Sequence, residues 1–268
     1  MTVLKDAVVL ITGANGGFGQ QMTRQLLAKE SKLILTDINI DALKETAATI
    51  SDEVRTGEIL GVFGADLSTP SGCEQIYQQA QEISEQTELS VDVLINNAGI
   101  AVAGRADEVP TEKGLQILNI NLIAPIRLCE LFMAGMIERE SGHIVNISSL
   151  AGWVGPPGLG HYAATKFGLR GFGLSLYEEL KPFNVHVTTI YPFYSDTPIL
   201  DSPRYGQLAE ETELRDNAIT DPADVVAEMI AGIEANQQHV FPDRTGKIIN
   251  NINRFVPWML PALLRRIS

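Results

Sequence analysis

The chain has 268 residues, of which 45% are hydrophobic and 20% charged, the balance of an ordinary soluble globular protein. Lysine and arginine number 20 against 33 aspartates and glutamates, and the net charge of −13 argues against general nucleic-acid binding. The two cysteines, Cys73 and Cys129, and the four scattered histidines lack metal-ligand spacing. We therefore expect no disulfide framework, no metal site and a reducing, cytoplasmic location. The first residues show no signal-peptide pattern, and no uninterrupted apolar run approaches the roughly 18 residues of a membrane span.

Short β-branched runs alternate with helical patterns from the start of the chain to about residue 241. The runs are apolar throughout, which predicts strands covered on both faces. Strand–helix alternation predicts one α/β domain over residues 1–268, with a doubly wound parallel sheet of about seven strands and helices on both faces. In chain order, the predicted strands are 7–11, 32–36, 59–63, 91–95, 143–147, 185–191 and a short 238–241, and the predicted helices are 17–29, 39–51, 70–87, 112–138, 162–181 and 221–235.

The first predicted strand is followed by TGANGGFG, residues 12–19, which opens into a helical pattern. Gly13 allows a tight turn, and Gly17 and Gly19 allow close approach by a phosphate and by the helix. The free N–H groups of the helix N-terminus favour a pyrophosphate. The loop therefore predicts a dinucleotide site at the carboxyl end of the first strand.

Asp37 ends the second predicted strand, 18 residues after Gly19. A carboxylate at this position can accept hydrogen bonds from the adenosine ribose and would repel a 2′-phosphate. No arginine stands beside the glycine loop or just after Asp37, so we expect NAD rather than NADP. The alternative role for Asp37 is an N-cap or turn residue before the helix predicted at 39–51.

Further motifs follow in chain order: Ala65-Asp66-Leu67, Asn96-Asn97-Ala98-Gly99, Asn121 in NINLIAP, Asn146-Ile147-Ser148-Ser149, and Tyr162 with Lys166 in YAATK. Together with TGANGGFG, this set closely resembles the single-domain branch of the short-chain dehydrogenase/reductase family, over residues 7 to about 200. The resemblance implies a Rossmann-like fold and an oxidoreductase that transfers a hydride between a nicotinamide cofactor and an alcohol or ketone.

The resemblance also implies roles for individual residues. Tyr162 would be the general acid/base, Lys166 would lower the pKa of its phenol and reach the nicotinamide ribose, and Ser149 would hydrogen-bond the substrate oxygen. Asn121 would hold a water that links Lys166 to solvent. Ser148 and Asn119 are the competing candidates for the roles of Ser149 and Asn121. The cofactor residues implied are Gly13, Asn15, Gly17, Phe18, Gly19, Asp37, Asp66, Leu67, Asn96, Ala98, Gly99, Tyr162, Lys166, Pro192 and Thr197.

The substrate side departs from the family pattern, because Pro192-Phe193 stands where the family has Pro-Gly. Phe193 and Tyr194 either border the nicotinamide and substrate or simply pack. The Gly/Pro-rich stretch 152–160 predicts an apolar wall, and 193–218 has the mixed polarity of a mobile substrate loop. We therefore expect a neutral, lipophilic secondary alcohol or ketone, such as a steroid-, retinoid- or long-chain-like molecule, with an aldehyde as a further option.

The apolar segment 253–268, with Trp258, has two interpretations. It is either an amphipathic membrane-surface element or a tail that packs on the pocket or on another subunit. We favour packing, because Pro257 and Pro261 interrupt a long helix and the chain is acidic. The resemblance implies a homodimer or homotetramer.

Two other functions compete with the leading hypothesis. The first is a non-catalytic dinucleotide-binding regulator or interaction protein, which the presence of all four catalytic candidates disfavours. The second is an epimerase or dehydratase that uses the same cleft, but such relatives carry a larger substrate domain than 268 residues leave room for.

Overall fold

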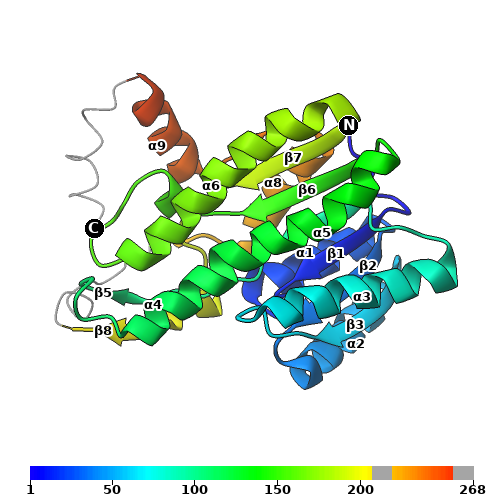
Figure 1. Cartoon of the computed structure of the whole chain (residues 1–268), viewed down its shortest axis with the longest axis horizontal. Helices are drawn as coiled ribbons and strands as arrows, with labels where there is room; N and C mark the ends of the chain where they lie inside the picture. Colours follow the sequence, from blue (N-terminus) through cyan, green and yellow to red (C-terminus); the bar gives the residue numbers. More distant parts are fainter. Residues whose placement is uncertain (207–218, 256–268) are drawn as a thin grey trace.

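A parallel seven-stranded sheet forms the centre of the computed structural model, which describes residues 1–206 and 219–255 (Figure 1). The strand order is β3-β2-β1-β4-β6-β7-β9, so the chain reverses its direction of travel between the neighbouring strands β1 and β4. In such sheets ligands bind beyond the carboxyl ends of the strands at this switch point. The strands are β1 (Val8–Thr12), β2 (Lys32–Asp37), β3 (Glu58–Gly64), β4 (Val93–Asn96), β6 (Gly142–Ile147), β7 (Val185–Ile190) and β9 (His239–Val240).

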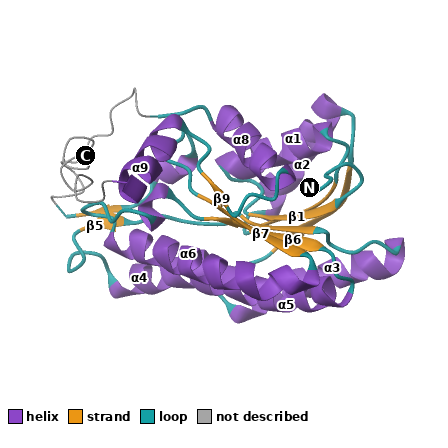
Figure 2. Cartoon of the chain, turned by 90° about the horizontal axis from the view of Figure 1, so that it is seen from above, coloured by secondary structure: helices purple, strands orange, loops and turns teal. Residues whose placement is uncertain are grey.

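Helices cover both faces of the sheet, as Figure 2 shows from above. One face carries α1 (Gly17–Ala28), α2 (Ile40–Val54) and α8 (Pro222–Glu234), and the other carries α3 (Pro70–Thr87), α5 (Ala124–Glu138) and α6 (Gly160–Leu180). Alternate strand residues enter the two layers: Val9 and Ile11 pack toward α1 and α8, while Val8 and Leu10 pack toward α3 and α5. The predicted doubly wound fold is confirmed, and the predicted strands and helices lie within a few residues of the observed ones.

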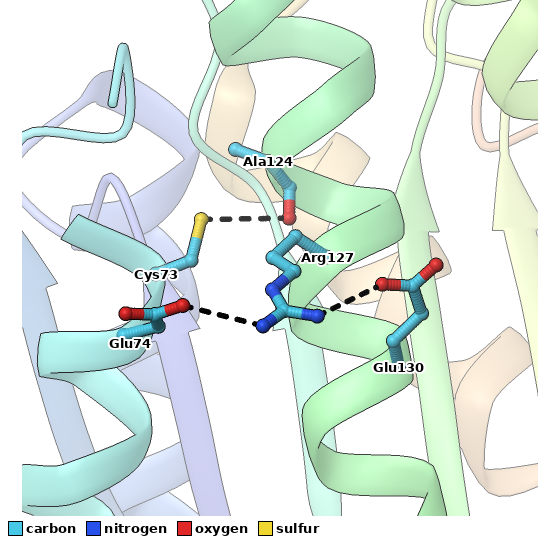
Figure 3. Close-up of polar contacts among 5 residues, drawn as sticks. All are labelled: Cys73, Glu74, Ala124, Arg127 and Glu130. Atoms are coloured by element: carbon cyan, nitrogen blue, oxygen red, sulfur yellow. Dashed lines mark hydrogen bonds and ion pairs between the residues drawn. The ribbon is translucent and has the colours of Figure 1, made fainter. Parts of the chain in front are cut away.

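The helices α3 and α5 lie side by side, and Figure 3 shows the polar contacts between them. The Cys73 thiol lies 3.8 Å from the carbonyl oxygen of Ala124, while Arg127 pairs with Glu74 at 3.2 Å and with Glu130 at 3.3 Å. Burial raises the pKa of the Cys73 thiol to about 11. A thiol with so high a pKa stays protonated at neutral pH, so this cysteine acts as a packing residue.

A continuous helix runs from Thr111 to Glu138, because α4 (Thr111–Leu118) joins α5 through a π-helical turn at Asn119–Ile123. By length and composition it could cross a membrane. Its residues Leu128 and Met136, however, are buried against the sheet, as expected of a core helix.

Three observed elements were not predicted. The helix α9 (Arg244–Phe255) has apolar residues at helical spacing but lies where the sequence was interpreted only as a chain end, and the strands β5 (Ala103–Gly104) and β8 (Arg204–Tyr205) have two residues each. β5 and β8 pair in parallel with about a hundred residues between them, which no local pattern can indicate. Most of the predicted substrate loop, 207–218, and most of the apolar segment, 256–268, lie outside the described residues.

A buried histidine closes the end of the sheet opposite the switch point. His143 is 1% exposed, and its ring nitrogens hydrogen-bond the hydroxyl groups of Thr2 and Thr188, each at 2.8 Å. Burial, with a smaller contribution from nearby His186, lowers the pKa of His143 from 6.5 to about 3. The folded protein therefore holds this imidazole neutral under conditions in which an exposed histidine takes up a proton.

This buried imidazole should make the fold sensitive to acid. Above pH 6.5 the folded and unfolded states are both neutral at His143; below it only the unfolded state gains the proton, so stability falls until about pH 3. The loss between pH 6.5 and 5 should be about 2 kcal/mol. Urea unfolding at several pH values measures it, and His143→Gln should flatten this part of the profile while lowering stability at pH 7. If stability falls with pH as steeply in the variant as in the wild type, groups other than His143 cause the loss.

Candidate active site

The glycine loop after β1 touches two other strand ends. Gly13 has a φ of +63°, and a Cβ added there would lie 2.7 Å from the Cα of Ala98, in the turn after β4. A Cβ on Gly17 would overlap Thr197, in the segment after β7. Gly19 lies against the backbone of the loop itself, so the first turn of α1 can close over it. The three glycines therefore draw together the carboxyl ends of β1, β4 and β7.

Hydrogen bonds also hold the end of β1 against the turn after β4. The Thr12 hydroxyl oxygen accepts from the backbone N–H groups of Asn97 and Ala98, both at 3.0 Å. The Asn97 side-chain amide in turn donates to the carbonyl oxygens of Thr12 and Gly13, at 2.9 and 3.0 Å. Sequence reasoning assigned no role to Thr12 or Asn97, although both belong to the quoted motifs and their polarity at strand ends was the available signal.

Asp37 lies beside the glycine loop and is half-buried. Its carboxylate accepts from the backbone N–H of Asn15 and from that of Asn39, both at 3.1 Å. The N-cap of α2 is Asn39, whose side chain accepts from the N–H of Ala42, so the alternative N-cap role of Asp37 is wrong. The bond from the Asn39 N–H, two residues on, is that of a turn residue, so the turn alternative agrees with the structure. None of the ion pairs among the described residues includes Asp37, which leaves its negative charge unneutralised beside the loop.

The residues after β3 lie near the surface, whereas the turn after β4 faces the glycine loop. After β3, Asp66 is exposed and accepts from the N–H of Ser68, while Leu67 packs partly into the core. After β4, the backbone turn of Ala98 and Gly99 faces the glycine loop and the catalytic candidates. Asn96 does not line this cleft with its side chain: it is buried, and its amide donates to the Asn146 side chain at 2.9 Å. The physical reason is the strand pleat, which turns Asn96 and Asn146 of neighbouring strands toward α5.

Asn121, rather than Asn119, points into the site. Asn119 is exposed, whereas Asn121 is fully buried within the π-helical turn, a distortion frequent at functional sites. Its side chain accepts from the N–H of Ile100 at 2.9 Å and donates to the carbonyl oxygen of Ile100 at 2.8 Å. A Cβ on Gly99 would lie 3.4 Å from the Asn121 carbonyl oxygen and 3.5 Å from the Lys166 ammonium, so both groups face the same turn.

The two neighbouring serines have separate roles. Ser148 is buried, and its hydroxyl donates to the backbone carbonyl of Lys166 at 2.9 Å, which ties α6 to the end of β6. Ser149 is half-buried, and its hydroxyl accepts from the N–H of Ala151 and donates to the carbonyl oxygen of Pro192 at 3.5 Å. It lies close enough to Tyr162 to lower the pKa of that phenol. Ser149 is therefore the serine that faces the phenol.

Tyr162 and Lys166 lie one helical turn apart on the buried side of α6. The Lys166 ammonium is 5.6 Å from the centre of the Tyr162 ring and donates to the carbonyl oxygen of Ile147 at 2.9 Å. Burial lowers the pKa of Lys166 to about 8. Burial also raises the pKa of Tyr162 to about 12, although the nearby Ser149 hydroxyl opposes this rise. The sequence predicted a lowered phenol pKa, whereas in this structure the pKa is raised, because loss of solvent is the largest contribution.

Comparison with known proteins agrees with this geometry. Residues 7–207 match the family model described as short chain dehydrogenase. The chain belongs to the short-chain dehydrogenase/reductase family. It is 33% identical over 231 residues to the rat (Rattus norvegicus) dehydrogenase/reductase SDR family member 7B, covering 83% of this chain and 70% of the relative. It is 29% identical over 262 residues to the human (Homo sapiens) estradiol 17-beta-dehydrogenase 11, covering 97% and 82%.

Solved family members share the fold. A short-chain dehydrogenase/reductase from Burkholderia phymatum in complex with NAD has a TM-score of 0.79 and 23% identity, with 95% of this chain and 96% of that chain covered. A short-chain dehydrogenase from Sphingobium yanoikuyae in complex with NADPH has a TM-score of 0.77 and 22% identity, with 94% and 95% covered. This chain is thus an NAD(P)-dependent oxidoreductase of the short-chain family. The glycine loop and the turn at Ala98 lie together at the switch point, and the close approach of their backbones fits a dinucleotide there.

The backbone at Phe193 is held by the carboxylate of Asp243, which lies 50 residues further along the chain. Phe193 has no left-handed backbone, so its position does not require glycine. Its N–H donates to the Asp243 carboxylate at 2.8 Å, and the same carboxylate accepts from the N–H of Gly246 in the first turn of α9. The Phe193 ring packs with Trp153 and Ile249 and meets the Tyr194 ring at 4.6 Å. Packing therefore explains Phe193, which is joined to α9 through Asp243.

Asp243 was not among the predicted site residues. It is 5% exposed and carries no ion pair among the described residues. The available signal was its spacing from Gly246 just after a predicted strand, which is typical of a helix N-cap.

The substrate side is bounded by two apolar clusters. Val102, Val109 and Ile117 pack with Tyr162 and Tyr205, which joins the β5–β8 pair to the catalytic phenol. The second cluster surrounds Trp153 and includes Leu150, Val154, Phe241 and Ile252. A cavity of about 430 Å³ also lies beside α9, lined by Trp153, His239, Phe241, Asn250 and Arg254; since neither Tyr162 nor Ser149 lines it, it is separate from the catalytic group.

Proposed function

We propose that this chain is an NAD(H)-dependent dehydrogenase/reductase for a neutral, lipophilic secondary alcohol or ketone. The observation that carries the proposal is the position of Tyr162, which packs against the cluster formed by Val102, Val109 and Ile117 and lies close enough to Ser149 for that hydroxyl to affect its pKa. A proton donor is thereby combined with an apolar wall. The human relative is named as an estradiol dehydrogenase, and a steroid of that kind has the size and polarity that such a wall suits.

The chain's own residues handle the proton. The bound nicotinamide supplies or accepts the hydride. Ser149 positions the substrate oxygen, and Tyr162 donates its proton to that oxygen as negative charge develops there. A phenol with a pKa near 12 is protonated at neutral pH, the form that can donate a proton to a carbonyl oxygen. The Lys166 ammonium then stabilises the phenolate until a proton returns, and Asn121 holds the turn at Ile100 that borders this path.

Turnover is the test of the catalytic proposal. The wild type should oxidise NADH, followed at 340 nm, with ketones from a panel of bulky lipophilic molecules. Tyr162→Phe should lower kcat by about 10²–10⁴-fold, because it removes the proton donor, while NADH still binds by fluorescence titration. Tyr77→Phe, a phenol on α3, serves as the matched control and should leave kcat unchanged. Full activity in Tyr162→Phe would remove the acid/base role, and NADH binding by the wild type without turnover of any panel member would support the regulatory alternative.

The preference for NAD rests on Asp37. Its carboxylate lies at the end of β2, hydrogen-bonded to the glycine loop at Asn15 and without an ion-pair partner among the described residues. A 2′-phosphate brought to this edge would meet an unneutralised negative charge, whereas the two ribose hydroxyls of NAD can donate to it.

Substitution of Asp37 should relax this selectivity. Asp37→Ser keeps an acceptor for the Asn15 N–H but removes the charge, so the ratio of kcat/KM for NAD over NADP should fall by about 10–100-fold. Asp66→Ser is the control for loss of a carboxylate at a neighbouring strand end. An unchanged ratio in Asp37→Ser would disprove the proposed ribose contact.

We also propose that two copies of the chain pair through the layer of α4, α5 and α6. Four apolar side chains are exposed on α4, the π-helical turn and α6: Leu115, Ile123, Phe167 and Leu174. Apolar side chains grouped on one helical layer are typical of a subunit interface.

A charge in the middle of this surface should separate the subunits. Ile123→Glu should shift the mass measured by light scattering from a dimer or larger to a monomer, because the carboxylate would be buried without a partner. Val3→Glu, at an exposed apolar position near the chain start, should keep the wild-type mass. A monomeric wild type, or an Ile123→Glu variant of unchanged mass, would contradict the proposal.

A further inference from the structure

Charge is distributed very unevenly along this acidic chain. Residues 244–268 contain no aspartate or glutamate but include five of the 20 basic residues: Arg244, Lys247, Arg254, Arg265 and Arg266. The other 243 residues therefore hold the remaining 15 basic residues and all 33 acidic ones, a net charge of −18. A basic block at one end of an acidic chain indicates an interaction with an anionic surface.

The described part of this block, α9, has two different faces. Its inner face is buried at Gly246 and Ile249, and Ile252 packs into the cluster around Trp153. Its outer face is apolar at positions one and three turns along the helix, with Ile248 46% exposed and Phe255 67% exposed.

Basic and amide residues complete the outer face. Arg244, Lys247, Asn251 and Arg254 are exposed, and Lys247 pairs with Glu228 of α8. At helical spacing, Arg244, Ile248, Asn251 and Phe255 form one stripe, which Lys247 and Arg254 flank. Basic residues beside exposed apolar ones are the pattern of a helix that lies in a membrane interface.

The position of α9 relates this face to the substrate side. Figure 1 shows α9 beyond the carboxyl ends of the strands, at the same end of the molecule as β5 and β8. Its inner face contacts Phe193, and Asp243 links its first turn to the Phe193 backbone. A surface that touched the outer face of α9 would thus lie next to the apolar substrate wall.

We propose that the outer face of α9 docks this protein on a membrane surface that carries anionic lipids. Charge complementarity selects that occupant, since the basic block is the part of a strongly acidic protein that an anionic surface attracts. The exposed Ile248 and Phe255 select a bilayer rather than a nucleic acid, because acyl chains accept apolar side chains and phosphate backbones do not. In sequence, Trp258 and further apolar residues follow at 256–268, with Arg265 and Arg266.

The packed tail favoured from the sequence covers 253–268, and most of that segment lies outside the described residues, so it stays a prediction. The structure adds the second, solvent-exposed face, which internal packing does not explain. Docking itself does not depend on the reaction. Its use, delivery of a lipophilic alcohol or ketone from the bilayer to the substrate side, rests on the proposed function.

Vesicle flotation of the purified full chain tests the docking. The probes are vesicles of phosphatidylcholine alone and of phosphatidylcholine with phosphatidylserine at about 30%. The wild type should float with the anionic vesicles, less so at high salt, and only weakly with the neutral ones. The double variant Ile248→Glu/Phe255→Glu should reduce the floating fraction by about tenfold, because it adds two negative charges and removes both apolar contacts. Phe183→Glu, at another exposed phenylalanine outside α9, should float like the wild type.

Each other outcome overturns the proposal. Absence of wild-type flotation with anionic vesicles rejects membrane docking, and equal loss in Phe183→Glu rejects the assignment to α9. Equal binding to both vesicle types rejects the role of charge. If the double variant floats normally but has a lower mass by light scattering, the face is a subunit interface.

Turnover separates this proposal from the proposed function. With a water-soluble ketone, the double variant should match the wild type, because Ile248 and Phe255 contact no catalytic group. With a ketone dissolved in anionic vesicles it should be slower by about the same tenfold factor as its flotation. If the wild type reduces neither ketone, the proposed function is wrong, while flotation still decides the docking on its own.

Discussion

The active site depends on one close contact, that of Gly13 with Ala98. A Cβ at Gly13 would lie 2.7 Å from the Cα of Ala98, so no side chain fits between the ends of β1 and β4. Thr12 and Asn97 close this contact with hydrogen bonds in both directions. Because Thr197 also lies against Gly17, the segment after β7 is held over the same loop. The dinucleotide crevice at the switch point is thus set by backbone proximity, with side chains in supporting positions.

The catalytic pair is held by a second set of contacts, at the end of β6. Ser148 binds the backbone of Lys166, and the Lys166 ammonium binds the carbonyl oxygen of Ile147, so α6 is fixed to the strand at two points. This fixation buries the Lys166 ammonium, while Tyr162 is half-buried. The pKa values of Tyr162 and Lys166 therefore move in opposite directions, the phenol upward and the ammonium downward, and each neutral form gains. The contacts that fix the geometry of the pair thus also raise the pKa of the phenol.

The sequence predicts those features whose contacting residues lie close together in the chain, and it fails where the contacting residues are far apart. The sheet and its helices follow from local apolar runs and capping residues, and the glycine loop, Ser149, Tyr162 and Lys166 follow from motifs a few residues long. Asn96 was placed wrongly, because its motif does not say which face of β4 it occupies. The raised pKa of Tyr162 was also missed, since burial in three dimensions decides it. β5, β8 and the role of Asp243 require partners at least 50 residues away, which no local pattern contains.

The cofactor half of the site depends on local motifs at the strand ends, whereas the substrate half depends on contacts between distant residues. The cofactor half is made of strand ends whose contacts are set by the order of the sheet. On the proposed substrate side, Phe193 and Trp153 pack with α9, while the β5–β8 pair packs with Tyr162 in a separate cluster. Because Asp243 connects the Phe193 backbone to the first turn of α9, any force that displaces α9 reaches the segment that ends at Thr197, over Gly17. Events at the outer face of α9 can therefore alter the substrate side without changing the residues that carry the proton.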